Sequence, residues 1–392
     1  MRPKSMRLGD VTTGVSTWNP SRTNPDDEFT YIDLSAIDQS AKVIAGPQRI
    51  VGSDAPSRAR QLIHAGDILV STVRPNLNAV AQVPEELDGA TASTGFTVLR
   101  PSNSVDSRYI FQWVKTPSFV SDMVSKSTGA SYPAVSDRIV KDSFVPLPPI
   151  DEQRRIAAIL DHADALRAKR REALARLDEL GDSVYADMFA DMHCHSRQVR
   201  LDEVSEIVSG ITKGRKVNGA PLRAVPYLAV ANVQDKALDL AVVKNIEATD
   251  AEIERWRLQR DDLLLTEGGD PDKLGRGSLW REELPEAIHQ NHVFRVRPDT
   301  SQVDPIYLNW AIGSRRGKAY FLRSAKQTTG IASINSTQLK AFPLELPSKD
   351  VQERFAQRVR AIDYVRDHYR TALAELDALF ASLQSRAFRG EL

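Results

Sequence analysis

The sequence predicts an α+β protein with two globular domains of mixed α/β structure and two long helices that form an antiparallel coiled coil with pseudo-twofold symmetry. Two stretches free of proline and glycine, 150–180 and 348–389, are the first evidence. An internal repeat and an apolar heptad spacing within those stretches are the second and third.

The repeat appears when the sequence is displaced by 199 positions, which places Ile156 on Phe355 and Leu160 on Val359. Similarity continues upstream with small gaps: VDSRYIFQWV at 105–114 resembles VDPIYLNWAI at 303–312, and GDILVSTVRPN at 66–76 resembles DDLLLTEGGDP at 261–271. Two copies of one unit suit a pseudo-twofold molecule better than a solenoid.

Apolar residues within the two helical stretches recur at steps of three and four, which is a heptad seam. The second copy departs from it only at Arg366, whereas the first is weaker, with Arg167, Arg170 and Gly181 at seam positions. The residues expected at the coiled-coil or partner surface are Ile156, Leu160, Leu174, Leu177, Phe355, Val359, Ile362, Leu373, Leu376 and Phe380. The alternative is that each stretch is an ordinary amphipathic helix on a core.

Each helical stretch follows a proline-containing segment and begins with acidic residues, which favour a helix N-terminus. We expect helices near 150–190 and 350–387, and strands near 67–71, 96–99, 262–266 and 293–297. The predicted segments are therefore a globular domain at 1–149, a helix at 150–192, a second globular domain at 193–347 and a second helix at 348–392.

Composition restricts the class of protein further. The 392 residues are 41% apolar and 27% charged with no net charge, as in ordinary globular proteins. No apolar run predicts a membrane span or a signal peptide. The single cysteine, Cys194, fits a cytoplasmic protein. His193 and His195 flank it, but no further ligands occur at zinc spacing, so this segment is interpreted as a linker.

Several motifs together resemble those of one family. PLPPIDEQRRIAAILDHAD, from Pro146 onward, resembles the segment that opens the helix in specificity subunits of type I restriction-modification systems. STGASYPAVS (127–136) and TTGIASINST (328–337) resemble the family's Thr-Gly segment, and 67–81 and 262–280 resemble its recurrent strand and loop. The order of domain and helix, found twice, covers the whole chain.

The resemblance implies a chain without a catalytic centre, in which each globular part is a target recognition domain that reads one half of a split, asymmetric sequence in double-stranded DNA. The helices set the spacer and dock two methyltransferase subunits, which bind S-adenosylmethionine and methylate adenine. Two restriction subunits that use ATP and Mg²⁺ can join. The chain itself needs no cofactor or metal.

Candidate DNA-binding residues follow from the family's loops and from the chemistry of base and phosphate contacts. Arginine suits guanine and asparagine suits adenine, whereas lysine suits phosphate; a polar turn is the competing interpretation. In the first half the candidates are Arg74, Asn76, Asn78, Lys126, Thr128, Gly129 and Tyr132. In the second half they are Lys213, Arg215, Lys216, Lys273, Arg276, Lys326 and Thr329.

Two other classes of function are weighed against this one. An enzyme is disfavoured because the chain has neither the Asn/Asp/Ser-Pro-Pro-aromatic motif of adenine methyltransferases nor a Walker A loop. A coiled-coil scaffold that binds no DNA leaves the family-like motifs unexplained. A specificity subunit of a bipartite system outside type I differs only in its partners, and the sequence does not separate it.

Overall fold

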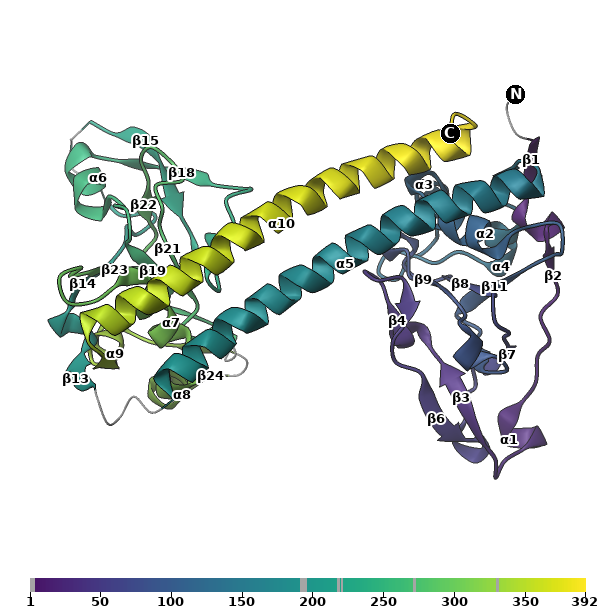
Figure 1. The fold of residues 1–392 in the computed structure, drawn as a ribbon, viewed down its shortest axis with the longest axis horizontal. Coiled ribbons are helices and arrows are strands. Elements are labelled where there is room, and N and C mark those ends of the chain that lie inside the picture. Colours follow the sequence, from purple (N-terminus) through teal and green to yellow (C-terminus); the bar gives the residue numbers. More distant parts are fainter. Residues whose placement is uncertain (1–3, 191–195, 217–218, 220, 271–272, 329–330) are drawn as a thin grey trace. The chain divides into compact units, whose positions relative to one another are not determined.

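The computed structural model describes the chain apart from residues 1–3, 191–195, 217–218, 220, 271–272 and 329–330. The chain divides into two compact units (Figure 1). The first contains Met1–Leu174 with His368–Leu392, and the second contains Ala175–Asp367. This division cuts both long helices, so each unit holds one globular part and one segment of each helix. The four segment bounds expected from the sequence stay a prediction.

The long helices are α5 (Ile150–Phe189) and α10 (Lys349–Arg389), which confirms the helices expected near 150–190 and 350–387. A buried glutamine fixes the start of each. Gln153 accepts from the Asp106 N–H at 3.0 Å and donates to the Pro148 carbonyl at 2.8 Å. Gln352 repeats this arrangement in the second copy, so both helix entries are attached to their globular parts by the same contacts.

The first unit contains two four-stranded sheets, in the orders β2-β11-β8-β9 and β6-β3-β10-β7. All their pairs are antiparallel except β3 with β10, and β1 pairs with β12 just before α5. The strands are β1 (Lys4–Arg7), β2 (Thr12–Thr13), β3 (Glu28–Ile32), β4 (Ile37–Asp38), β5 (Val43–Ile44), β6 (Gln48–Val51), β7 (Ala59–Leu62), β8 (Ile68–Ser71), β9 (Val80–Gln82), β10 (Thr91–Ser93), β11 (Phe96–Pro101) and β12 (Phe144–Leu147). The short helices are α1 (Pro20–Thr23), α2 (Ser107–Val114), α3 (Pro117–Ser125) and α4 (Asp137–Lys141).

The second unit has a related topology with fewer strands in its second sheet and an additional small sheet, β20-β25-β24. Its four-stranded sheet has the order β14-β23-β19-β21, and in the sheet β18-β15-β22 the strands β15 and β22 are parallel. The strands are β13 (Arg197–Arg200), β14 (Ser205–Ser209), β15 (Arg223–Leu228), β16 (Val233–Gln234), β17 (Ala237–Leu238), β18 (Lys244–Ala248), β19 (Leu263–Thr266), β20 (Gly268–Gly269), β21 (Gly277–Leu279), β22 (Ile288–His289), β23 (Val293–Pro298), β24 (Lys326–Thr328), β25 (Ile331–Ser333) and β26 (Pro343–Leu346). The helices are α6 (Asp250–Trp256), α7 (Pro305–Gly313), α8 (Arg315–Ser324) and α9 (Ser336–Lys340).

The strands β8, β11, β19 and β23 confirm the four strands expected from the sequence. They are fully or almost fully buried runs at the centre of each unit, where aliphatic side chains pack on both faces.

The two long helices pack antiparallel, and the globular cores share their apolar faces. In the first unit Ile156 and Leu160 of α5 belong to the same core as Phe380 of α10. In the second, Phe355 and Val359 of α10 share a core with Phe189 of α5. Each seam therefore combines helix–helix packing with packing on a domain. The remaining seam residues are placed as follows: Ile362 is buried, whereas Leu174, Leu177, Leu373 and Leu376 are half-buried.

Gly181, which interrupts the seam in the sequence, has a packing reason. A Cβ at this position would overlap Cη2 of Trp310. Trp310 stacks on Tyr185 and meets Phe355 edge to face, and Lys236 covers its ring with Nζ 3.5 Å from the centroid. The indole thus needs a glycine on α5.

Candidate nucleic-acid interface

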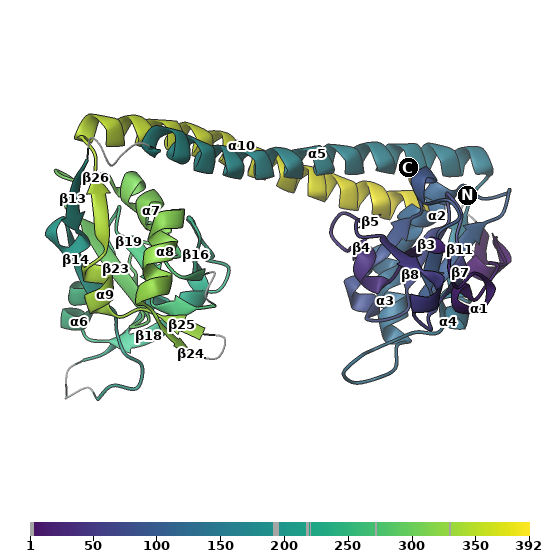
Figure 2. The ribbon, with the colours of Figure 1, turned by 90° about the horizontal axis from the view of Figure 1, so that it is seen from below.

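In the first unit the structure joins two of the candidate segments. The loop after β8, residues 72–78, pairs with the Thr-Gly segment 127–135 that precedes α4. The Arg74 N–H donates to the Pro133 carbonyl at 2.7 Å, and the Arg74 guanidinium lies 4.7 Å from the Tyr132 ring centroid. The loop between α3 and α4 projects from this unit (Figure 2). Contacting residues more than fifty positions apart in the chain thus form one surface.

The backbone of this surface has conformations that L-residues seldom adopt. Arg74 and Asn78 have φ of 49° and 46°, and Gly129 has φ of 103°. The Lys42 ammonium donates to the Asn78 carbonyl at 2.6 Å and holds one end of the loop. Burial and the neighbouring charge of Lys115 lower the pKa of Lys42. The loop is therefore fixed by hydrogen bonds to two other segments, and strained backbone of this kind concentrates at functional sites.

The side chains of this surface differ in their exposure and in whether they are already paired. Arg74, Asn76 and Thr128 are exposed, and Tyr132 is 68% exposed. Asn78 is half-buried. Lys126, just after α3, is exposed but pairs with Asp122 of that helix at 2.7 Å. The surface thus offers one cation stacked on an aromatic ring and two polar side chains.

In the second unit the corresponding segments also meet. The loop after β19 contributes β20, which pairs antiparallel with β25 of the Thr-Gly segment. The Ile334 N–H donates to the Glu267 carbonyl at 2.9 Å, and β24 pairs with β25 to bring Lys326 into the same small sheet. Lys326 is exposed there. The two loops therefore converge in both units, although their side chains differ.

The remaining candidates of this loop are placed less uniformly. Lys273 is exposed and pairs with Asp270 within the loop. Arg276 is partly buried, and its Nη1 donates to the Gln234 side chain at 3.1 Å. Sequence reasoning missed Gln234, because the contact depends on folding of a separate hairpin. Thr329, like the segment 191–195 with His193, Cys194 and His195, lies outside the described residues.

Arg215 anchors the basic loop 208–216 to neighbouring segments of the second unit. Arg215 makes two hydrogen bonds of 2.6 Å to the carboxylate of Glu252, and a third of 3.0 Å to the Glu247 carbonyl. These bonds raise the pKa of Arg215, and the guanidinium lowers the pKa of Glu252 to about 2. Lys213 lies 5.1 Å from the Tyr227 ring centroid and is exposed, as is Lys216. Arg215 therefore positions the loop, whereas the two lysines face solvent.

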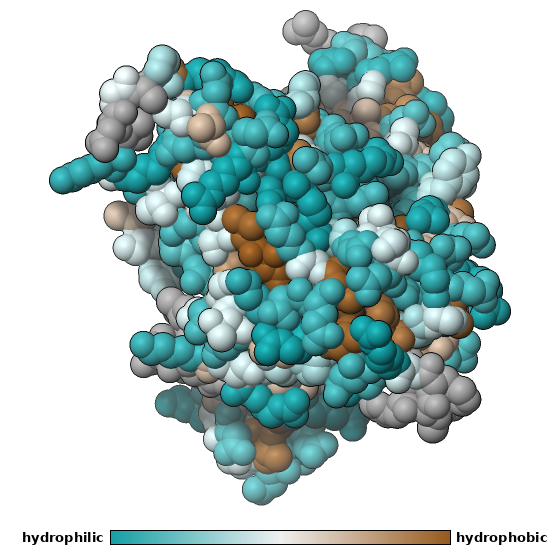
Figure 3. Space-filling view, turned by 90° about the vertical axis from the view of Figure 1, so that its left-hand side faces the viewer, coloured by the Kyte–Doolittle hydropathy of each residue, from teal (hydrophilic) through white to brown (hydrophobic). Residues whose placement is uncertain are grey.

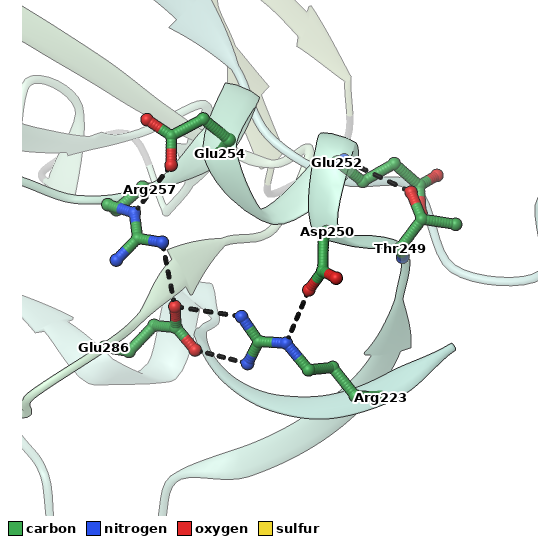
Figure 4. Close-up of polar contacts among 7 residues, drawn as sticks. All are labelled: Arg223, Thr249, Asp250, Glu252, Glu254, Arg257 and Glu286. Carbon is green, nitrogen blue, oxygen red and sulfur yellow. Dashed lines mark hydrogen bonds and ion pairs between the residues drawn. The ribbon is translucent and has the colours of Figure 1, made fainter. Parts of the chain in front are cut away.

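Helix α6 and its neighbouring strands are connected by ion pairs (Figure 4). The Thr249 side chain caps its first turn by accepting from the Glu252 N–H. Arg223 of β15 pairs with Asp250 at 2.8 Å and with Glu286, which also pairs with Arg257 at 3.0 Å. Ion pairs thus connect β15, the segment around α6 and the loop that contains Glu286.

The face of the second unit seen in Figure 3 is mainly hydrophilic, with small separated apolar areas. Over the described part of the chain, no group of three or more His, Cys, Asp or Glu residues is arranged to hold a metal ion. Among the same residues, no helix is long and apolar enough to cross a membrane. The side chains described at the two loop surfaces can supply hydrogen bonds, cationic contacts and stacking.

Comparisons with known proteins agree with this geometry. Residues 6–176 match the model of the type I restriction modification DNA specificity domain. The StySPI specificity subunit of Salmonella potsdam, a type I restriction enzyme subunit, is 23% identical over 314 residues, which are 75% of this chain and 67% of that relative.

Two solved structures share the architecture. A chain from a study of complex assembly and conformational transition of the type I R-M system is 25% identical, with a TM-score of 0.62 over 100% of this chain and 98% of its own. The type I restriction-modification S subunit from M. genitalium, at 12% identity, has a TM-score of 0.58 and covers 99% of both chains, which shows the common fold. Over residues 6–176 the chain is thus similar to the type I restriction modification DNA specificity domain, and beyond them it resembles type I specificity subunits in sequence and fold.

Proposed function

We propose that this chain is the DNA-recognition component of a type I restriction-modification complex and reads a bipartite, asymmetric duplex sequence with one globular part per half-site. The observation that carries this proposal is the repeated convergence of two loops in each unit. The same backbone arrangement presents Arg74, Asn76 and Tyr132 in one unit and Lys326 with a glycine-rich loop in the other. Equivalent frames with different side chains suit two different half-sites.

The chemistry of the loops matches base and phosphate contacts. Arginine and asparagine can each make paired hydrogen bonds to guanine and adenine edges, and an exposed tyrosine can stack on a base. Lysines such as Lys213 and Lys216 suit phosphates, which fix register without reading sequence. Because the net charge of the chain is zero, we infer that partner subunits supply much of the phosphate contact.

The partners complete the proposal. The long helices dock two methyltransferase subunits, which bind S-adenosylmethionine and methylate adenine at N6. Two restriction subunits that use ATP and Mg²⁺ join them, and the complex acts in the cytoplasm. The chain contributes recognition and no catalytic group.

Sequencing of N6-methyladenine in the host genome, with and without this gene, tests the function. The expected result is loss of methylation at one split, asymmetric motif. Methylation that is unchanged in a host that expresses the chain together with a copurifying methyltransferase would contradict the proposal. The identity of the copurified subunits separates a type I system from a bipartite system of another type.

A further inference from the structure

Each unit contains a charged cluster within the apolar contact between α5 and α10. In the first unit, Arg167 of α5 pairs with Asp164 of its own helix at 2.7 Å and with Asp377 of α10 at 2.5 Å. Its side chain is 18% exposed, and the guanidinium lies 4.3 Å from the Phe380 ring centroid. An arginine at an apolar seam is thus satisfied by one carboxylate from each helix.

The second unit contains an equivalent cluster. Arg366 of α10 pairs with Asp363 of its own helix and with Asp178 of α5, where Nε lies 3.1 Å from the carboxylate. Its side chain is 13% exposed. Burial raises the pKa of Asp363, although the neighbouring arginine opposes this.

The two clusters are equivalent in the internal repeat. The displacement of 199 positions places Asp164 on Asp363, Arg167 on Arg366 and Asp178 on Asp377. Each arginine therefore takes one partner three residues before it and one from the opposite helix. The arginine that interrupts the apolar seam in each helix therefore belongs to the same ion-paired arrangement, which occurs twice.

Of the registers that differ by one heptad, only the observed one places an aspartate of the opposite helix beside each arginine. If α10 slipped by one heptad in one direction, Arg370 would take the place of Asp377 opposite Arg167, and Arg171 would take the place of Asp178. Slippage in the other direction would place Gln384 opposite Arg167 and Tyr185 opposite Arg366. Both alternatives leave a largely buried guanidinium without its cross-helix carboxylate, and the first adds like-charge repulsion. Partly buried ion pairs contribute little net stability, but polar groups in a seam can select register.

We propose that Arg167 and Arg366, with their aspartates, are the residues that select the register of α5 against α10 and thereby the spacing between the two half-sites. The part that concerns spacing rests on the proposed function. One heptad corresponds to about 10 Å along a helix, or about three base pairs at 3.4 Å each.

A distance measurement tests the register without DNA. In a chain with Cys194→Ser, spin labels at the exposed positions 168 of α5 and 374 of α10 report the axial offset of the helices by pulsed electron resonance. The unmodified seam should give one distance. The double variant R167L/R366L, which replaces both cations with apolar side chains that suit a seam, should add a second, longer distance. The control R170L alters an arginine that stacks on Tyr369 at 4.2 Å, and should keep one distance.

Binding of the assembled complex to DNA duplexes that carry both half-sites with varied spacers tests the consequence for specificity. The affinity of R167L/R366L for a duplex whose spacer differs by about three base pairs should be within tenfold of its affinity for the duplex with the native spacer. R170L should keep the preference of the unmodified chain for the native spacer. A single distance and a single spacer in the double variant would show that aromatic packing alone sets the register and would overturn the proposal.

A second variant covers the case in which R167L/R366L fails to fold. D178N/D377N keeps the side-chain shapes and removes the cross-helix charge, so it should also broaden the distance distribution, and one narrow distance would refute the register role. If the unmodified complex binds no bipartite duplex, the proposed function fails, while the label distances still decide the register.

Discussion

Replacement of Gly129 by alanine tests whether the Thr-Gly surface of the first unit binds DNA. Gly129 has φ of 103°, and a Cβ there would lie 2.8 Å from the Tyr132 carbonyl oxygen. That oxygen belongs to the backbone of the same turn, so it cannot move as the end of a flexible side chain could. Alanine should therefore open the turn that places Tyr132 beside Arg74.

The size of the effect follows from these two costs. A left-handed conformation costs an L-residue about 1–2 kcal/mol, and the close approach to a backbone oxygen adds to that. If DNA binding requires the original loop conformation, the binding free energy of G129A is weakened by this strain of at least about 2 kcal/mol, and 1.4 kcal/mol corresponds to tenfold in affinity. We expect G129A to weaken binding of a target duplex roughly 30-fold at fixed salt, with little change in the melting temperature because the loop is exposed.

The assay is fluorescence anisotropy of the assembled complex with a labelled bipartite duplex, beside thermal unfolding of the chain. The matched control is G89A. Gly89 lies in the same unit with φ of 78°, but a Cβ at this position would have no atom within 4 Å. Hydrogen bonds to the buried Ile63 keep the Gly89 turn from opening, so G89A should lower stability by about 1–2 kcal/mol and leave affinity within twofold. Equal affinity of G129A and the unmodified chain would refute a DNA-binding role for this loop.

Three further predictions concern the second unit. G181A should lower the stability of this unit by about 1–3 kcal/mol through overpacking. In a W310L background the same substitution should be neutral or stabilising, because the overlap with the indole is gone and the gain in helix propensity of about 1 kcal/mol remains. Unfolding curves of the unmodified chain, G181A, W310L and the double variant decide this. Glu252 has an ordinary pKa of 4.5 and a folded pKa of about 2, so its stabilising effect is present above pH 4.5 and lost as the pH falls toward 2; acid unfolding of E252Q should lack that contribution, and an unchanged acid limb would contradict the assignment. K213Q should reduce the slope of log affinity against log salt by about 1, whereas an identical slope would exclude a phosphate contact.

The sequence predicts the helices and central strands well because local periodicity determines them. The bounds of α5 and α10 and the four buried strands depend on apolar spacing and on acidic residues at helix starts. Gly181 and Arg366 looked like interruptions of that spacing. Their reasons are Trp310 and Asp178, which are far away in the chain and meet them only after folding.

The candidate site was predictable in its location but not in the role of each side chain. Composition marks loops that are rich in glycine and basic residues, and the structure brings two such loops together in each unit. Whether a cation is free depends on partners that spacing does not reveal. Arg215 is held by Glu252, whereas Lys216 of the same loop is exposed. Lys42 was missed because its contact with Asn78 joins separate loops.

The two halves have equivalent contacts at the starts of the long helices, whereas the side chains of their loop surfaces differ. Tyr109 donates to the Pro146 carbonyl at 2.6 Å, and Tyr307 donates to the equivalent Glu345 carbonyl at 2.5 Å. Burial raises the pKa of both tyrosines, so each stays a donor at physiological pH. Because these contacts attach each loop-bearing part to a helix entry of the same geometry, side chains in one loop surface can change without altering the support of the other. A frame of this kind permits two independent half-site preferences within one chain.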